Sequence, residues 1–487
     1  MSASIKKNFL YNSIITTAHY IFPFITYPYV SRVLGVTNIG LCNFVDSIIF
    51  YFILFSTFGI SAVGTREVAR CKGNVHALRR TFSSLFAFNA ITTLIAVITL
   101  AIATMVVPKL HEHWEMMLVG GIRLVFNFLL IEWFFRGMED FRFITLRTIA
   151  VRILYIIMIF VFIHDADDYF KFYVISMLVV AINAIINFLY SRRLTSFSIK
   201  EIDTSPFIKS LLILGIYNIV TSMYTSFNVA FLGFTSGETE VGYYTTATKL
   251  YSIILSIFTA LTSVMLPRQS ALLSEGKFEE YKVMLNKTTN ILFLLFVPIV
   301  FYCIIYAPDI IHLISGSGYE GAILPMRIVM PLMIICGYEQ ILVIQGLMPL
   351  KKDKAVFRNS IIGCFVGLAL NITIVPYLNS MGSAIVWLCS EIAVLISAQY
   401  YMTKYVQICF PYKYLLSQIL YNIPLLFFLF VIYKEIKVQS IIILLISGFV
   451  MCIYFIFFNT KIIKNAFVIN TLKQIKDRSL NNGSSSK

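Results

Sequence analysis

The sequence predicts an all-α polytopic membrane protein with about fourteen transmembrane helices. Of its 487 residues, 59% are hydrophobic and only 13% are charged, whereas charged residues make up about 25% of a soluble globular domain. Its apolar runs are long enough for transmembrane helices, which need about 20 mostly apolar residues each. Strands of a membrane barrel would alternate apolar and polar residues instead. The composition therefore excludes a soluble enzyme, a disordered chain and a membrane barrel.

Fourteen apolar runs follow one another along the chain, separated by short polar connections. Their lengths and low charge are typical of membrane-spanning helices. The connections are too short to hold a soluble domain. The predicted spans lie near residues 9–31, 38–62, 82–107, 116–135, 145–163, 172–190, 208–232, 243–265, 289–306, 325–347, 358–377, 382–401, 415–433 and 440–458.

The basic residues predict the orientation of the chain. The N-terminus, the loops after even-numbered spans and the C-terminal tail together hold 30 Lys and Arg residues, whereas the opposite loops hold 6. Three more, Arg123, Arg152 and Lys249, lie inside spans. Since cytoplasmic loops carry the excess of basic residues, we expect both termini in the cytoplasm. This rule also accounts for the net charge of +15, and we expect no nucleic-acid partner.

The sequence contains a faint internal repeat. The segment LGVT at residues 34–37 is followed by Gly40, and LGFT at residues 232–235 is followed by Gly242. Six spans separate the two copies, and an even number keeps them in the same orientation. The pattern predicts two parallel six-helix lobes and these parts of the chain: an N-terminal lobe at 1–205, a C-terminal lobe at 206–405, two further spans at 406–460 and a cytoplasmic tail at 461–487.

Basic residues within or beside the spans predict a cavity for an anionic head group such as a diphosphate. A charge at the centre of a transmembrane helix costs about 2.5–3.5 kcal/mol, so it usually faces a cavity. Arginine can bind phosphate bidentately and lysine as a point charge. Snorkelling or topology explains cations near span ends equally well, whereas Arg123 and Lys249 lie deeper. The candidate substrate-binding residues are Arg32, Arg66, Arg123, Lys249, Arg268 and Arg327.

Three acidic residues in the spans are candidates for ion coupling: Asp46, Glu339 and Glu391. A buried carboxyl group can exchange a proton during a transport cycle. Pairing with a neighbouring cation is an alternative role that the sequence leaves open. The eight cysteines are scattered and show no metal-ligand spacing, so we expect neither a metal site nor a cofactor.

Enzyme motifs are weak. A DxD pattern occurs at residues 165–167, but it lies in a short outward loop, where a hydrated turn is the simpler explanation. The sequence has no GxxxxGK[ST] nucleotide-binding loop. We therefore expect a transporter and not an enzyme.

A series of segments resembles one transporter family. They include TYPYVSRVLGVTNIGLCNFVDSI, FSTFGISAVGTREVAR, FFRGMEDF, FLGFTSGETEVGYYTTATKL and GSGYEGAILPMRIVMPLMII, followed by the stretch from QGLMPLKKDKAV to GSAIVWLCSEIAVL. By their order and spacing, the chain resembles a Wzx-type oligosaccharide flippase, in the polysaccharide-transporter branch of the MOP (multidrug/oligosaccharidyl-lipid/polysaccharide) superfamily. The resemblance covers nearly the whole chain.

The resemblance implies a MOP or MATE-like fold, with two six-helix lobes around a V-shaped cavity and two extra C-terminal helices. The implied cargo is a polyprenyl-diphosphate-linked oligosaccharide, flipped across the cytoplasmic (inner) membrane for surface polysaccharides such as O-antigen or capsule. A proton or sodium gradient would drive alternating access, and other membrane proteins of polysaccharide assembly are possible partners. Two alternatives stay open: a MATE-like cation-coupled drug antiporter, and a membrane glycosyltransferase or polysaccharide polymerase.

The family pattern also selects individual residues. It implies roles for Arg32, Arg66, Lys249, Arg268 and Glu391, whereas Arg123 and Arg327 rest on their depth in the spans. One position departs from the pattern. The family commonly has an acidic residue in span 7 before the LG, where this chain has Asn228. Any ion-coupling role of that acid must be absent or must lie elsewhere here.

Overall fold

The computed structural model describes residues 3–436, 438–465, 468–470, 472 and 474. Within these residues, eleven helices are long and apolar enough to cross a membrane. Large apolar side chains cover their outer faces: Phe365, Phe427 and Phe449 are more than three-fifths exposed. Such a continuous apolar exterior requires lipid around it. The chain is a multi-pass, all-α membrane protein, as the sequence predicts.

The first half of the chain consists of long helices and short connecting turns. Its elements are α1 (Ala3–Thr57), α2 (Ile60–Cys71), α3 (Val75–Val106), α4 (Pro108–Glu112), α5 (Trp114–Phe128), α6 (Glu132–Gly137), α7 (Phe141–Phe162), α8 (Tyr169–Ser191) and the short 3₁₀ turns η1 (Ala166–Asp168) and η2 (Ile199–Glu201).

The second half is built in the same way and ends in two further long helices. Its elements are α9 (Ser205–Thr225), α10 (Phe227–Ser236), α11 (Glu238–Ser274), α12 (Phe278–Ile305), α13 (Ala307–Ser315), η3 (Glu320–Ala322), α14 (Ile323–Val329), α15 (Leu332–Gln340), the π-helical turn η4 (Ile341–Leu347), α16 (Asp353–Val406), α17 (Tyr412–Glu435), α18 (Ser440–Phe457) and the π-helical turn η5 (Phe458–Ile462).

Two of the longest helices each contain a sharp break. In α1 the break is at Gly35, with φ 76° and ψ 169°, a conformation that glycine adopts without steric cost. In α16 it is at Asn379, with φ 50° and ψ −129°. Both breaks lie within connections that the sequence predicts between two spans. The number of spans therefore depends on how α1 and α16 are divided, and the figure of fourteen stays a prediction.

Four predicted spans are not continuous helices, which corrects the sequence interpretation. One cause is Pro331, which has no backbone N–H to continue a helix and lies between α14 and α15. Another is Ile131, whose φ of 36° separates α5 from α6. The affected spans are 38–62, 116–135, 208–232 and 325–347, interrupted at residues 58–59, 129–131, 226 and 330–331.

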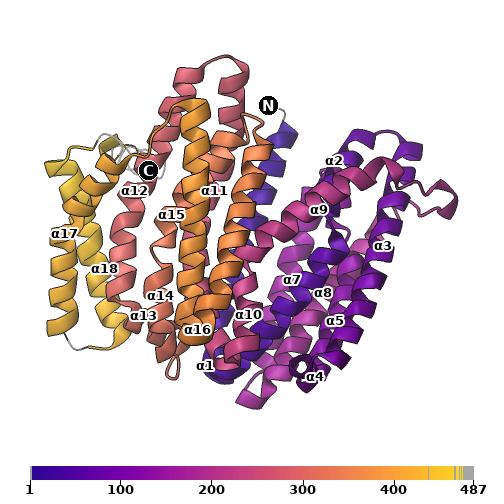
Figure 1. Ribbon diagram of the computed structural model, residues 1–487, viewed down its shortest axis with the longest axis horizontal. Helices are drawn as coiled ribbons and strands as arrows, with labels where there is room; N and C mark the ends of the chain where they lie inside the picture. The colour runs from indigo at the N-terminus through magenta and orange to yellow at the C-terminus, as the bar shows by residue number, and fades with distance from the viewer. Residues whose placement is uncertain (1–2, 437, 466–467, 471, 473, 475–487) are drawn as a thin grey trace, which may run out of the picture.

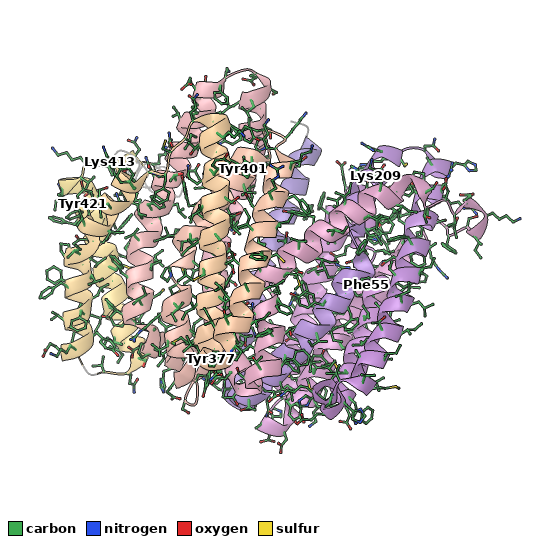
Figure 2. All side chains as sticks on the ribbon, viewed as in Figure 1. Phe55, Lys209, Tyr377, Tyr401, Lys413 and Tyr421 are labelled. Atoms are coloured by element: carbon green, nitrogen blue, oxygen red, sulfur yellow. The ribbon has the colours of Figure 1, made fainter. Side chains whose placement is uncertain are left out.

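The helices form two groups side by side (Figure 1). Helices α2–α8 make up one group and α11–α16 the other, with α17 and α18 along the far edge of the second. The groups splay apart toward the upper end of the view and meet at the lower end, near α1, α10 and α16. Lys209 and Lys413, both assigned to the cytoplasmic side by sequence, lie toward the upper end, and Tyr377 lies at the lower end (Figure 2).

The largest apolar core joins the two groups. It includes Phe44 from α1, Tyr244 from α11 and Tyr338 from α15, all nearly fully buried. A second core lies within the N-terminal group around Trp133, and it also takes in Leu211 of α9. Helix α9 therefore packs on the N-terminal group with one part while it packs along α16 with another.

Candidate functional site

Charged residues from several helices meet at one cavity. The cavity has a volume of about 260 Å³ and is lined by α1, α7, α8 and α11. Asp46, Arg152 and Lys249 line it, and Arg123 on α5 reaches Asp46, with 2.6 Å between its Nη1 and the Asp46 Oδ1. Three cations and one carboxylate thus lie in or beside this cavity. We call this space the cationic cavity.

The fold of α1 brings the two ends of this cavity together. Because the helix is broken at Gly35, Tyr27 before the break and Asp46 after it line the same space. The apolar residues between them bury the helix in the core, as Phe44 and Val45 show with no exposed surface. A glycine in the left-handed region thereby positions both walls of the cavity.

Lys249 is the contribution of the C-terminal half to the cationic cavity. Its ammonium group lies 4.3 Å from the centre of the Tyr27 ring, a distance at which a cation–π attraction offsets part of the cost of burying the charge. The Tyr27 hydroxyl in turn is 2.6 Å from the Thr246 hydroxyl. Lys249 also lines a second cavity of about 260 Å³ between α1 and α11, which we call the flanking cavity.

The contacts between α1 and α11 reproduce the internal repeat of the sequence. The hydroxyls of Thr37 and Thr239, 202 residues apart, are 2.9 Å from each other. Asn43 donates to the Thr245 hydroxyl over 3.2 Å, again at a separation of 202 residues. Residues related by a two-fold axis can meet each other only at that axis. These pairs therefore lie on an axis of pseudo-symmetry between the two halves.

Two glycines allow this close approach. A Cβ atom on Gly40 would lie 1.7 Å from the carbonyl oxygen of Glu238, and one on Gly242 would lie 2.3 Å from that of Val36. Both distances are far below van der Waals contact. Alanine is excluded at either position while α1 and α11 are closed against each other, so the two glycines permit the seal at this end of the molecule.

The acidic residues of the C-terminal half lie apart from the cationic cavity. Glu391 on α16 is buried and accepts a hydrogen bond from Trp387 Nε1 over 3.0 Å. Glu339 on α15 lies close enough to interact electrostatically with Glu391. Nearby, Asn371 donates to the Oδ1 of Asn228 over 2.7 Å, and both amides are buried. The residue that replaces the usual acid therefore takes part in a neutral amide pair.

Four candidate cations lie outside the cationic cavity. The guanidinium group of Arg32 donates to the Leu313 carbonyl oxygen, and Arg327 donates to that of Ile304 over 3.1 Å. Arg66 pairs with the neighbouring Glu67 at 2.8 Å. Arg268 lines a groove of about 750 Å³ between α11 and α12, with Lys287. The structure thus brings together Asp46, Arg123 and Lys249 out of the candidates and leaves these four elsewhere.

The structure also reveals a buried cation, Arg147, which is one of the 30 basic residues counted for the cytoplasmic side. The side chain of Arg147 is only 4% exposed. Its Nη2 lies 2.8 Å from Glu132 Oε1 and also donates to Thr148 over 3.0 Å. Its Nε and Nη1 are buried without a hydrogen-bond partner among the described residues. Arg147 lies near the start of a predicted span, where basic residues commonly set the orientation of a membrane protein. Only its pairing with Glu132 distinguishes it from such a residue.

Two sequence comparisons find known proteins that are similar to this chain. A family model described as "Polysaccharide biosynthesis protein" matches residues 5–273. The "Putative O-antigen transporter" of Escherichia coli (strain K12) is 23% identical over 391 residues, covering 80% of this chain and 94% of that protein.

Two solved structures have the same architecture. One described as "Lipid II flippase MurJ, inward closed conformation" has a TM-score of 0.76 at 15% identity and covers 93% of this chain and 98% of its own. An inward-facing MATE family multidrug resistance transporter of the MOP superfamily has a TM-score of 0.61 at 15% identity and covers 81% of this chain and 98% of its own. The predicted MATE-like fold is confirmed.

Proposed function

The chain belongs to the polysaccharide biosynthesis protein family, and on this basis we propose that it flips lipid-linked oligosaccharides across a membrane. The proposed substrate is a polyprenyl-diphosphate-linked oligosaccharide that moves from the cytoplasmic to the outer leaflet of the inner membrane. It would serve the assembly of a surface polysaccharide, together with other membrane proteins of that process.

The cationic cavity is the observation that carries this proposal. Arg123, Arg152 and Lys249 outnumber the single carboxylate of Asp46, so the cavity favours an anion. A diphosphate offers several oxygen atoms to guanidinium and ammonium groups, which bind phosphate by charge-assisted hydrogen bonds. The same excess of positive charge would repel the cationic compounds that a drug antiporter carries.

The flanking cavity supplies a route for a lipid-linked substrate. The polyprenyl chain is too apolar to leave the bilayer, so the head group must enter from the side. Phe24, about half exposed, and Ile253 line this cavity between α1 and α11, and Lys249 lines both it and the cationic cavity. In this proposal the head group passes between α1 and α11 toward Lys249 while the lipid chain stays in the membrane.

The way the two halves meet supports transport by alternating access. The α1–α11 contacts at Gly40 and Gly242 close one end, and the helices splay apart toward the other (Figure 1). With both termini in the cytoplasm, as the distribution of basic residues predicts, the closed end faces outward. We assign the coupling of a proton or a sodium ion to Asp46, Glu339 and Glu391.

The experiment is to replace Arg123 or Lys249 with alanine in a strain that lacks the native gene. Each variant should abolish surface glycan while the protein remains in the membrane at its normal level. Lys171→Ala serves as the matched control, because Lys171 is an exposed cation that pairs with Asp168 and does not line the cavity. Normal glycan export by both cavity variants would refute the proposal. Efflux of a cationic dye would favour the drug antiporter, and glycan that is flipped but never lengthened in a deletion strain would favour an enzyme.

A further inference from the structure

An ion pair at the cationic cavity already engages Arg123, one of the groups proposed to bind the diphosphate. Arg123 Nη1 lies 2.6 Å from Asp46 Oδ1. The side chains of Arg123 and Asp46 are 25% and 42% exposed, and Asp46 lines the cavity, so the pair is not sealed in the core. A guanidinium group holds a phosphate best through two parallel N–H donors. Asp46 already engages one of the donors of Arg123.

Asp46 is also the one acidic residue among those that line this cavity. The other ionisable groups that line it are Arg152 and Lys249, the phenols of Tyr27, Tyr155 and Tyr173, and the thiol of Cys42. An anionic head group entering the cavity would therefore meet one fixed negative charge, placed directly against one of its own binding groups. Like charges held this close repel strongly because the cavity screens them less than water does.

We propose that Asp46 is an internal competitor of the substrate, which holds Arg123 in the empty protein and must give it up when the diphosphate binds. This inference rests on the proposed function and adds a specific role for Asp46 within it. The carboxylate weakens binding of the head group in the loaded state. It also favours release, because Arg123 regains a partner as the substrate departs.

The competition makes a prediction that a purely structural role does not. A structural ion pair, when broken, destabilises the protein and leaves ligand affinity the same or lower. A competitor, when removed, increases ligand affinity. Since the side chain of Arg123 is 25% exposed, an unpaired Arg123 can be hydrated, and the Asp46→Asn variant should fold.

The binding test uses the purified full-length protein in detergent, with inorganic diphosphate as the probe and isothermal titration calorimetry as the readout. Asp46→Asn should bind diphosphate about tenfold or more tightly than the wild type, the effect expected for one close charge pair. Asp46→Ser provides a second variant should the amide disturb folding. Asp167→Asn, which removes the same charge from the exposed 3₁₀ turn η1, should bind like the wild type.

A double-mutant cycle shows whether the effect acts through Arg123. Arg123→Gln alone should weaken binding, and Asp46→Asn added to it should restore little, since the group that Asp46 occupied is gone. Equal gains from Asp46→Asn with and without Arg123 would mean that Asp46 acts as a general negative charge and would overturn the competition.

The transport test uses proteoliposomes and a short-chain prenyl diphosphate. Asp46→Asn should lower both the half-saturating substrate concentration and the maximal rate, because tighter ground-state binding without tighter transition-state binding slows turnover. Asp46→Glu, which keeps the carboxylate, should restore part of the rate. If Asp46→Asn binds diphosphate no more tightly than the wild type while the Arg123 and Lys249 variants lose export, this inference fails alone. If those variants export normally, the proposed function fails.

Discussion

An alanine at Gly40 should prevent α1 and α11 from closing the sealed end of the molecule. Its Cβ would lie 1.7 Å from the Glu238 carbonyl oxygen, whereas carbon–oxygen contacts are about 3.3–3.6 Å. The helices would have to separate locally by about 1.6 Å to reach that contact distance. Overpacking of this kind costs about 1–3 kcal/mol. Alanine is also the better helix former, but this gain is present in the open and closed conformations alike and cancels between them.

The cost therefore applies to the closed conformation alone. A change of about 1–3 kcal/mol shifts an equilibrium by about 5- to 150-fold. Gly40→Ala should raise the ratio of the conformation open at this end to the conformation closed at this end by that factor. Because a transporter must visit both conformations, glycan export should fall even though the protein is folded and the cationic cavity is intact.

Native Cys42 can report the opening. It lines the cationic cavity and is 5% exposed. In a variant whose other seven cysteines are replaced by serine, a membrane-impermeant maleimide added from outside should label Cys42 faster when Gly40 is alanine. Gly121→Ala is the matched control, because its Cβ would make only an ordinary contact, 3.5 Å from Leu100. Labelling and export equal to this control would refute the role assigned to Gly40.

Two further predictions concern stability. Glu132→Gln leaves the buried guanidinium of Arg147 without its carboxylate and should lower the free energy of unfolding by about 3–5 kcal/mol. Denaturant unfolding in detergent measures this change. The double variant that also carries Arg147→Met should recover most of the lost stability. Asp203, between α8 and α9, accepts hydrogen bonds from the Ser205 hydroxyl and from Arg80, which hold the pKa of its carboxyl below its ordinary value. A lowered carboxyl pKa stabilises the fold above the unfolded-state pKa, and this contribution is lost as the pH falls through the folded-state pKa. Asp203→Asn should therefore unfold at a lower temperature than the wild type at about pH 6, and this difference in unfolding temperature should shrink toward about pH 3. A difference in unfolding temperature that does not change with pH would contradict this.

The depth of a charge in its span separated two groups of candidates in the sequence. Arg123 and Lys249 lie well inside predicted spans, and the structure places both at the cationic cavity. Arg32 lies just beyond a predicted span, and Arg327, although selected for its depth, lies only two residues inside one. Both donate to backbone carbonyl oxygens of neighbouring segments instead. Depth is informative because a cation far from the interface cannot reach water by extending its side chain.

The sequence did not reveal which charged side chains form ion pairs between helices. Asp46 was a candidate for ion coupling, yet nothing in the sequence linked it to Arg123, which lies 77 residues away and on another helix. Arg147 was counted with the cytoplasmic cations for the same reason, since its partner Glu132 lies on another helix, α6, across the turn between α6 and α7. Interactions between helices depend on rotation and register, which periodicity along a single apolar run does not define.

By itself, the sequence determined that the chain is an all-α, multi-pass membrane protein, because apolar length and charge content decide what a bilayer accepts. Through the offset of 202 residues between Gly40 and Gly242 it also indicated an internal repeat. The tertiary structure alone decided that these two glycines allow a close approach of α1 and α11, and that a break at Gly35 places Asp46 and Tyr27 around one cavity. The physical reason is that apolar surface is interchangeable along a helix in lipid, whereas close contacts and ion pairs require particular atoms at particular distances.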